Sequence, residues 1–217
     1  MNRSAGRTAC VGARLAVALA VFGLVGCGSL NLGSAQATNW YSLNDKRLPN
    51  AGRPMPVALD QVLVIGPVDA NPFYDSTQLA FSRSEAARVT HQSAAWTERP
   101  TKRLATLVER RLAADGGFEA VASATAGIRA DLVLNLTLDE IYHDTLQLPG
   151  TGRVVVVAEL IDPRTRSLLG RQRFQAEAPV AEPAAASAVR ALSEALTRLL
   201  DELGAWVRET ASGAARS

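Results

Sequence analysis

The sequence predicts an α/β protein of the α+β type, a single domain in which a mixed β-sheet carries two main helices on one face. Three observations lead to this fold class. Apolar residues recur with a period of two in some segments, typical of strands, and near 3.6 in others, typical of helices. The predicted order is strands, helix, a hairpin series of strands and a final helix. About 190 residues follow the first segment, enough for one core.

The first 26 residues have the layout of a secretory signal peptide. A positive start precedes the uncharged apolar run 15–26, and its charges come from Arg3, Arg7 and Arg14. The run is too short to span a bilayer, which takes roughly 20 apolar residues. It ends in Leu24-Val25-Gly26-Cys27, which resembles the lipobox of bacterial lipoproteins. The alternatives are a plain signal peptide or an uncleaved anchor with an incidental cysteine.

Cys27 is the predicted lipidation site, carrying diacylglycerol and palmitate-type acyl chains. Each buried methylene contributes about 0.8 kcal/mol, so two or three chains hold a protein on a membrane without a transmembrane helix. By resemblance to bacterial sorting rules, Gly28 rather than aspartate after the cysteine indicates the outer membrane, with the protein facing the periplasm. Residues 27–38 are small and polar and predict a lipidated flexible tether.

The charge of the chain argues against a nucleic-acid partner, and its cysteine content argues against a disulfide. Removing three signal arginines from 23 basic residues leaves 20 against 21 acidic residues, a net charge of −1. A nucleic-acid partner would call for a basic stripe, and none is present. Cys10 leaves with the signal and Cys27 becomes a thioether, so no disulfide is expected.

The predicted domain spans 39–210, and its first half alternates short strands and loops. A short strand begins at Trp40, prolines mark a loop near residues 49–56, and a buried strand over 61–68 is stopped by Gly66-Pro67. Two further strands are expected, over 78–83 and 88–92. A helix follows, with Pro100 in its first turn and Gly116-Gly117 after its end; its apolar face is Leu104, Leu107, Val108 and Leu112. A strand over 118–122 comes next.

The second half begins with a strictly alternating strand from Asp131, whose pattern slips at Asp139-Glu140, where we expect a bulge or the strand's end. The strand 153–161 contains an unbroken valine run, which predicts cover on both faces. If both helices lie on one face, the second cover comes from another subunit or from the loop 44–56.

The chain ends with a turn, a strand and the longest helix. Asp162-Pro163 predicts the turn, and the partner strand covers 168–178. The last helix opens at Glu182-Pro183, and its apolar face is Ala185, Ala188, Val189, Leu192, Leu196, Leu199, Leu200, Leu203 and Trp206. A disordered tail is expected over 211–217.

The residues that could carry chemistry form no recognisable catalytic set. Metalloprotease, hydrolase, phosphate-loop and dinucleotide motifs are missing from the sequence. His91 and His143 lie on separate elements, so a shared metal site is less expected than two exposed strand-end histidines. Asp139 and Glu140 are strand neighbours, which face opposite ways and cannot share a proton, so a solvated strand end is expected. We therefore expect no enzyme, no cofactor and no metal.

Tryptophans are the other candidates. Trp96, just before the first helix, could be a binding aromatic. We expect instead that Trp96 and Trp40 cap the core, since large aromatics are highly buried on average.

The order of several motifs resembles a known family, the auxiliary lipoproteins of ABC-type transporters, including the PqiC-like lipoproteins of mammalian-cell-entry (MCE) lipid transport systems. The resembling features are Cys27, Trp40-Tyr41-Ser42-Leu43, Val62-Leu63-Val64-Ile65-Gly66-Pro67-Val68, Asp75 with Gln78-Leu79 and Arg83, and Ala95-Trp96-Thr97-Glu98-Arg99-Pro100. They cover nearly all of the mature chain. The segment after Asp75 lacks the Arg-Pro pair of the family, which puts a surface role of this loop in doubt.

The resemblance implies a non-enzymatic periplasmic partner of an MCE-domain tunnel protein and its ABC transporter, which carry phospholipid between the two membranes. The lipoprotein would dock the tunnel at the outer membrane. Members of the family can form homo-oligomeric rings, which would also cover the valine strand.

Two other classes stay open at this point. An envelope assembly or secretion lipoprotein for polysaccharide or fibre export would have a similar fold, and neighbouring genes would distinguish it. A periplasmic hydrolase would need a deep pocket that unites His91 or His143 with a nucleophile.

Overall fold

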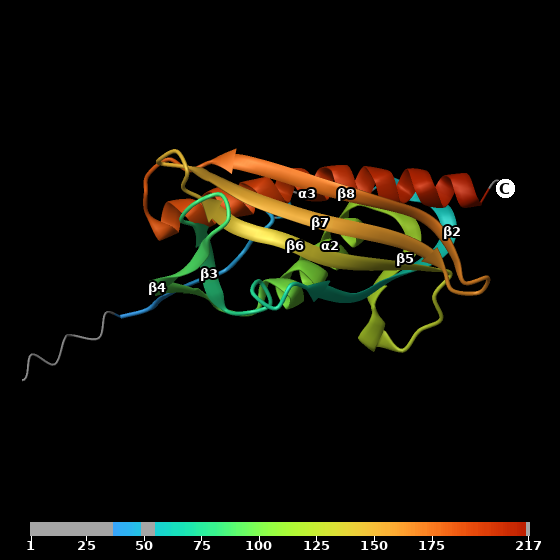
Figure 1. The fold of residues 1–217 in the computed structure, drawn as a ribbon. Helices are drawn as coiled ribbons and strands as arrows, with labels where there is room; N and C mark the ends of the chain where they lie inside the picture. Colours follow the sequence, from blue (N-terminus) through green and yellow to red (C-terminus); the bar gives the residue numbers. More distant parts are fainter. Residues whose placement is uncertain (1–36, 49–54, 216–217) are drawn as a thin grey trace, which may run out of the picture. The chain divides into compact units, whose positions relative to one another are not determined.

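A mixed β-sheet forms the centre of the fold (Figure 1). The computed structural model describes residues 37–48 and 55–215, so the signal peptide, Cys27 and most of the tether lie outside the described residues. Within them, the sheet has eight strands. The elements are β1 (Asn39–Tyr41), β2 (Met55–Ala70), β3 (Gln78–Ser82), β4 (Arg88–Trp96), α2 (Pro100–Asp115), β5 (Gly116–Ser123), the 3-10 turn η2 (Ala124–Ala126), β6 (Leu132–Asp144), β7 (Thr151–Asp162), β8 (Ser167–Pro179) and α3 (Ala185–Ala214).

Strand β6 is the axis of the sheet. One edge of β6 pairs antiparallel with β7, which pairs antiparallel with β8. The other edge is shared: the first part of β6 pairs parallel with β2, while His143 near its end pairs parallel with Phe81 of β3. Strand β5 extends the sheet beyond β2, and β4 and then β1 extend it beyond β3. The predicted mixed sheet is therefore confirmed.

Both helices pack on the same side of this sheet, as predicted (Figure 1). Helix α2 packs on β2 and β5, and α3 packs on β7 and β8. Alternate residues of β6 and β7 face the helices and are at most 2% exposed: Leu132, Leu134, Leu136, Leu138, Val154, Val156, Ala158 and Leu160. The period of two in the sequence therefore marks the core face of β6.

The predicted end of the second strand at Gly66-Pro67 is wrong, because β2 continues to Ala70. Its register against β6 shifts between Ile65 and Val68, so the irregularity absorbs Pro67, which has no N–H for the ladder. A Cβ on Gly66 would lie 2.4 Å from Asn135 Oδ1. The two residues that predicted a stop instead mark an irregularity inside a longer strand.

The slip at Asp139-Glu140 is a bulge, one of the two predicted outcomes. Leu138 pairs with Val156, yet Glu140 pairs with Val155, so one extra residue enters β6. The strand does not end there, because it runs on to Asp144.

The valine run is covered on both faces, and the second cover at Val155 comes from side chains of the sheet itself. Val155 faces away from the helices and is 0% exposed. Its register partners are Glu140 on β6 and Gln175 on β8, and Arg153 bonds both of their side chains. The long polar side chains of the same sheet therefore cover Val155.

The loop expected over that face lies instead on the helix side. The backbone N–H of Asn44 donates to Ser193 Oγ (3.2 Å), and that of Lys46 donates to Thr197 Oγ1 (2.9 Å). Both hydroxyls belong to α3, so the described part of this loop, residues 44–48, binds the last helix.

The two helices follow their predicted patterns, with one correction at the C-terminus. Helix α2 ends before Gly116 and Gly117, whose φ values of 76° and 99° favour glycine. Helix α3 runs to Ala214 and buries Val207 and Ala211, each 0% exposed. The disordered tail expected from residue 211 is therefore wrong for residues 211–214, because the apolar face extends beyond Trp206. In the described part of the chain, none of the helices combines the length and apolar character that spanning a bilayer takes.

Candidate functional site

A buried arginine joins the first folded segment to both helices. Arg111 on α2 is 1% exposed, and its guanidinium donates to the carboxylates of Asp45 and Asp201. Its Nε lies 3.5 Å from Asp115 Oδ2. Two outer arginines complete a group that we call the Arg111 cluster: Arg47, Arg111, Arg208, Asp45, Asp115 and Asp201. Three positive and three negative charges therefore balance inside it.

The cluster favours the charged forms of Arg111 and Asp201. Burial alone would lower the pKa of Arg111, but the hydrogen bonds that its guanidinium donates to Asp45 and Asp201 outweigh burial and hold the pKa above its usual range. Burial alone would raise the pKa of Asp201, yet Arg111 and Arg47 hold it below its usual range. A buried charge of this kind is stable only while its partners are present.

One signal in the sequence points to Arg111. It follows Leu104, Leu107 and Val108 at helical spacing, so it occupies a position on the apolar face of α2. A charged residue on such a face needs a buried partner. The partner could not be named from the sequence, because Asp45 and Asp201 are far from Arg111 along the chain.

The segment that follows the tether is also clamped by Arg103. Its Nε donates to the carbonyl oxygen of Leu43 (2.7 Å), and its Nη2 donates to Asn44 Oδ1 (2.9 Å). Leu43 itself is buried in the core. Arg103 therefore fixes the backbone after β1 to α2.

The face of the sheet away from the helices carries paired charges. Arg153 donates to Glu140 (2.8 Å) and Glu177 (2.6 Å), and Arg173 lies 3.8 Å from Asp139. We call this surface the charged face: Asp139, Glu140, Arg153, Glu159, Arg171, Arg173, Gln175 and Glu177. Its charges pair with each other across β6, β7 and β8, which are antiparallel neighbours.

The prediction that Asp139 and Glu140 face opposite ways is wrong, because the bulge turns both side chains to the charged face. Because of the bulge, both side chains meet arginines of the charged face, Arg173 and Arg153 respectively. The predicted solvated strand end is wrong, since both acids lie inside β6 and are half-buried. Each carboxylate has its own arginine, which does not suit a shared proton.

The histidines lie nearer to each other than their sequence positions indicate. His143 is 3% exposed and its Nε2 lies 2.8 Å from the carbonyl oxygen of Pro149, so the predicted exposed site is wrong for this residue. His91 is half-buried and its ring packs at a tilt of 45° against that of Phe81, with ring centroids 4.7 Å apart. Burial lowers the pKa of His91, and the charge of His143 lowers it further.

We expect the stability of the domain to fall on acidification because of His91. Its folded pKa lies below the unfolded value of about 6.5, so the unfolded chain binds the proton more tightly. Its contribution is therefore complete above pH 6.5 and is lost as the pH falls through the folded pKa. Urea unfolding between pH 8 and pH 5 measures the loss, and His91→Phe, which keeps a ring beside Phe81, should flatten this part of the profile. An unchanged profile in that variant would assign the effect to other groups.

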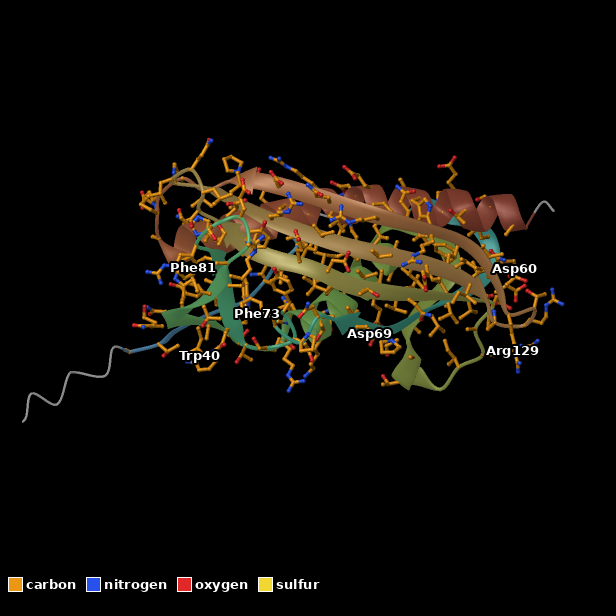
Figure 2. All side chains as sticks on the ribbon, in the orientation of Figure 1. Trp40, Asp60, Asp69, Phe73, Phe81 and Arg129 are labelled. Carbon is orange, nitrogen blue, oxygen red and sulfur yellow. The ribbon has the colours of Figure 1, made fainter. Side chains whose placement is uncertain are left out.

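Neither histidine lines any of the three cavities described next. One of 730 Å³ is lined by Asp60, Arg129 and Asp162, and Figure 2 shows Asp60 and Arg129 at one end of the sheet. One of 740 Å³ lies between β2 and the exposed side of α2. The third, of 470 Å³, lies beside the β6–β7 loop. Among residues 37–48 and 55–215, no three histidine, cysteine or acidic side chains could together hold a metal ion.

The two tryptophans behave differently. Trp96 is 2% exposed and belongs to the core, as predicted. Trp40 is 60% exposed and points outward, so its predicted role as a cap is wrong (Figure 2). It lies in β1, a three-residue strand that pairs only with β4, where the neighbouring Tyr41 packs against the core instead.

Asp75, one of the residues that carried the family resemblance, has a structural role. Its Oδ1 accepts from Thr101 Oγ1 (2.7 Å) and its Oδ2 from Arg99 (3.2 Å). Both partners lie at the N-terminus of α2, where a negative charge is favourable. Asp75 therefore fixes the loop after β2 to the first turn of that helix.

Before any comparison, these features describe a domain in which residues 43–48 are bound to both helices and the charges of the Arg111 cluster and the charged face are paired. The family model for the ABC-type transport auxiliary lipoprotein component matches residues 41–204, so the chain belongs to that family. Membership places it among the lipid-anchored proteins of the cell envelope.

Solved structures share the fold at low sequence identity. A protein from Xanthomonas campestris, of the family named DUF330, superposes with a TM-score of 0.73 at 18% identity, covering 82% of this chain and 100% of its own. An uncharacterized protein gives 0.62 at 13% identity, covering 79% and 99%. The PelC dodecamer of Paraburkholderia phytofirmans gives 0.39 at 15% identity, covering 69% and 93%, which carries no argument about assembly. No curated protein matches the chain.

Proposed function

We propose that this chain is an outer-membrane lipoprotein that faces the periplasm and serves an MCE-type lipid transport system. Acyl chains on Cys27 hold it on the membrane, and the folded domain docks the MCE-domain tunnel protein and its ABC transporter. Its role is structural and not enzymatic. A homo-oligomeric ring belongs to the same proposal.

The observation that carries the proposal is the attachment of residues 43–48 to both helices. Asp45 lies in the Arg111 cluster, and Leu43 and Asn44 are bound by Arg103. The segment that follows the predicted tether, which ends at residue 38, is thereby fixed to the core. This attachment suits a docking part that must keep its position when a partner binds, and membership of a transport auxiliary family agrees with it.

The pairing of charged residues supports a role without catalysis. A general acid or base needs access to substrate and a pKa suited to proton transfer. The carboxylates of the Arg111 cluster and of the charged face are each engaged by arginine. The histidines line none of the three cavities described above.

Capture from envelope membranes through a C-terminal tag tests this function. We expect the wild-type lipoprotein to bring down an MCE-domain protein and ABC transporter subunits. Cys27→Ala should leave the domain folded, release it into the soluble periplasmic fraction and abolish capture, because acylation supplies the membrane affinity. Cys10→Ala is the matched control, since it removes the other cysteine without touching the predicted lipidation site.

Two results would contradict the proposal. Membrane retention of Cys27→Ala at the wild-type level would remove the lipid anchor. Capture of a polysaccharide synthase or secretin in place of transport subunits would favour the export class of lipoprotein.

A further inference from the structure

The loop between β6 and β7 exposes two leucines. Leu146 is 51% exposed and Leu148 is 71% exposed, the latter the most exposed large apolar side chain among the described residues. The same loop lines the 470 Å³ cavity together with Val180. Single exposed leucines are common on protein surfaces, but two in one short loop make a small apolar projection.

This loop is held in place by bonds at its base. Ser82 Oγ donates to Asp144 Oδ1 (2.9 Å), which also accepts from the backbone N–H of Leu146 (3.0 Å). The N–H of Val180 donates to the carbonyl oxygen of Gly150 (2.9 Å), and His143 lies 2.8 Å from that of Pro149. These hydrogen bonds fix both ends of the loop. The two leucines therefore project from a well-held loop although they do not pack into the core.

The direction of the strands places this loop at the end of the sheet from which the chain arrives. Strand β3 runs parallel to β6, and Phe81 pairs with His143, next to the loop. Strand β4 is antiparallel to β3, and β1 is parallel to β4, so β1 runs away from the loop end. The chain therefore enters β1 from the side of the β6–β7 loop, in agreement with Figure 1.

The length of chain before β1 limits how far this end can lie from the anchor. Eleven residues separate Cys27 from Asn39, and a fully extended chain of that length spans at most about 40 Å. Asn39 pairs with Ala94 of β4, and the adjacent Ala95 pairs with Gln78, three residues before Phe81. Strand β1 therefore begins nearer to the β6–β7 loop than to the opposite end of the sheet at Leu132. A bilayer that holds acyl chains at Cys27 is thus within reach of the β6–β7 loop.

We propose that Leu146 and Leu148 insert into the interfacial region of the phospholipid bilayer that carries the Cys27 anchor. The domain then rests on this end of its sheet, and the opposite end, with the 730 Å³ cavity, faces away from the membrane. The two exposed leucines contact lipid and not another protein. The inference rests on the proposed lipid anchor and adds an orientation to it.

Apolar contact, and not charge, makes this attachment. The adjoining β3–β4 turn carries Arg83 and Glu85, whose charges cancel. Insertion should therefore persist in high salt, where attraction between charged residues and anionic lipid is screened.

A single thiol placed in the loop tests the proposal. Once the signal is removed and Cys27 is acylated, Leu148→Cys supplies the only free thiol of the chain, which can be labelled with an environment-sensitive fluorophore. The acylated protein is reconstituted in vesicles of phosphatidylethanolamine and phosphatidylglycerol that contain a nitroxide-labelled lipid. We expect a blue shift and strong quenching of the label, retained in high salt.

Leu168→Cys is the matched control. Leu168 is a 56% exposed leucine at the start of β8, beside the β7–β8 turn at the opposite end of the sheet. Its label should keep a water-like emission and stay unquenched. Equal quenching at positions 148 and 168, or no quenching at 148, would overturn the proposal. Protection of position 148 only after a transport protein is added would also overturn it, in favour of a protein occupant.

Two further measurements distinguish a failure of this inference from a failure of the proposed function. Mass spectrometry shows whether the protein is acylated, and flotation shows whether it binds vesicles. An acylated, floating protein without quenching at position 148 refutes the orientation alone. Quenching at 148 in a protein that captures no transport subunits supports the orientation and leaves the transport assignment contradicted. An unacylated protein that does not float overturns both.

Discussion

Replacing Arg111 with leucine is expected to lower the free energy of unfolding by about 3–5 kcal/mol, because it strands buried carboxylates without a counter-charge. Asp45 has a side chain that is 0% exposed and loses its arginine partner in this variant. The total free energy of unfolding of a domain is roughly 5–15 kcal/mol. The expected loss is therefore a large fraction of the stability. Urea unfolding of the chain, followed by circular dichroism, measures the loss.

Two further variants show that the loss comes from the stranded charge. Arg47→Ala removes a 49% exposed arginine of the same cluster and should cost less than about 1 kcal/mol, as exposed ion pairs do. Asp45→Asn added to Arg111→Leu removes the unpaired charge and should recover part of the stability. If Arg111→Leu alone unfolds at the wild-type urea concentration, the cluster does not hold the N-terminal segment.

Replacing Gly152 with alanine is expected to destabilise the domain by about 1–3 kcal/mol or more, as overpacking does. A Cβ at this position in β7 would lie 2.6 Å from the backbone nitrogen of Leu192 and 2.8 Å from the carbonyl carbon of Ala191. Both atoms belong to the backbone of α3, which cannot rotate away as a side chain could. The helix must therefore move off the sheet, and a lower thermal unfolding midpoint is the measure.

Gly213 provides the matched control for this steric effect. It lies in the same helix, and a Cβ there would meet nothing within 4 Å. Gly213→Ala should leave the midpoint unchanged or raise it, since alanine favours a helix over glycine by up to about 1 kcal/mol. Equal midpoints for Gly152→Ala and the wild type would mean that α3 does not approach β7 closely.

Two of the wrong predictions, the end of β2 and the cover of the valine run, share one cause. Gly66-Pro67 is a local stop signal, but a register shift against β6 lets β2 continue. The valine run in β7 predicted an external cover, while long side chains of β6 and β8 supply it. In both cases a neighbouring strand, remote in sequence, changed the outcome.

The sequence by itself determined the element order, the faces of the strands and helices that form the core, and the predicted anchor at Cys27, which rests on local residues alone. Periodicity is sufficient for these features because burial follows from spacing along one element. Only the tertiary structure decided the partners of Arg111, the burial of His143 and the close approach of α3 to Gly152. Each of these depends on contacts between elements that are far apart in the sequence. The interaction energy of such a contact cannot be read from either segment alone.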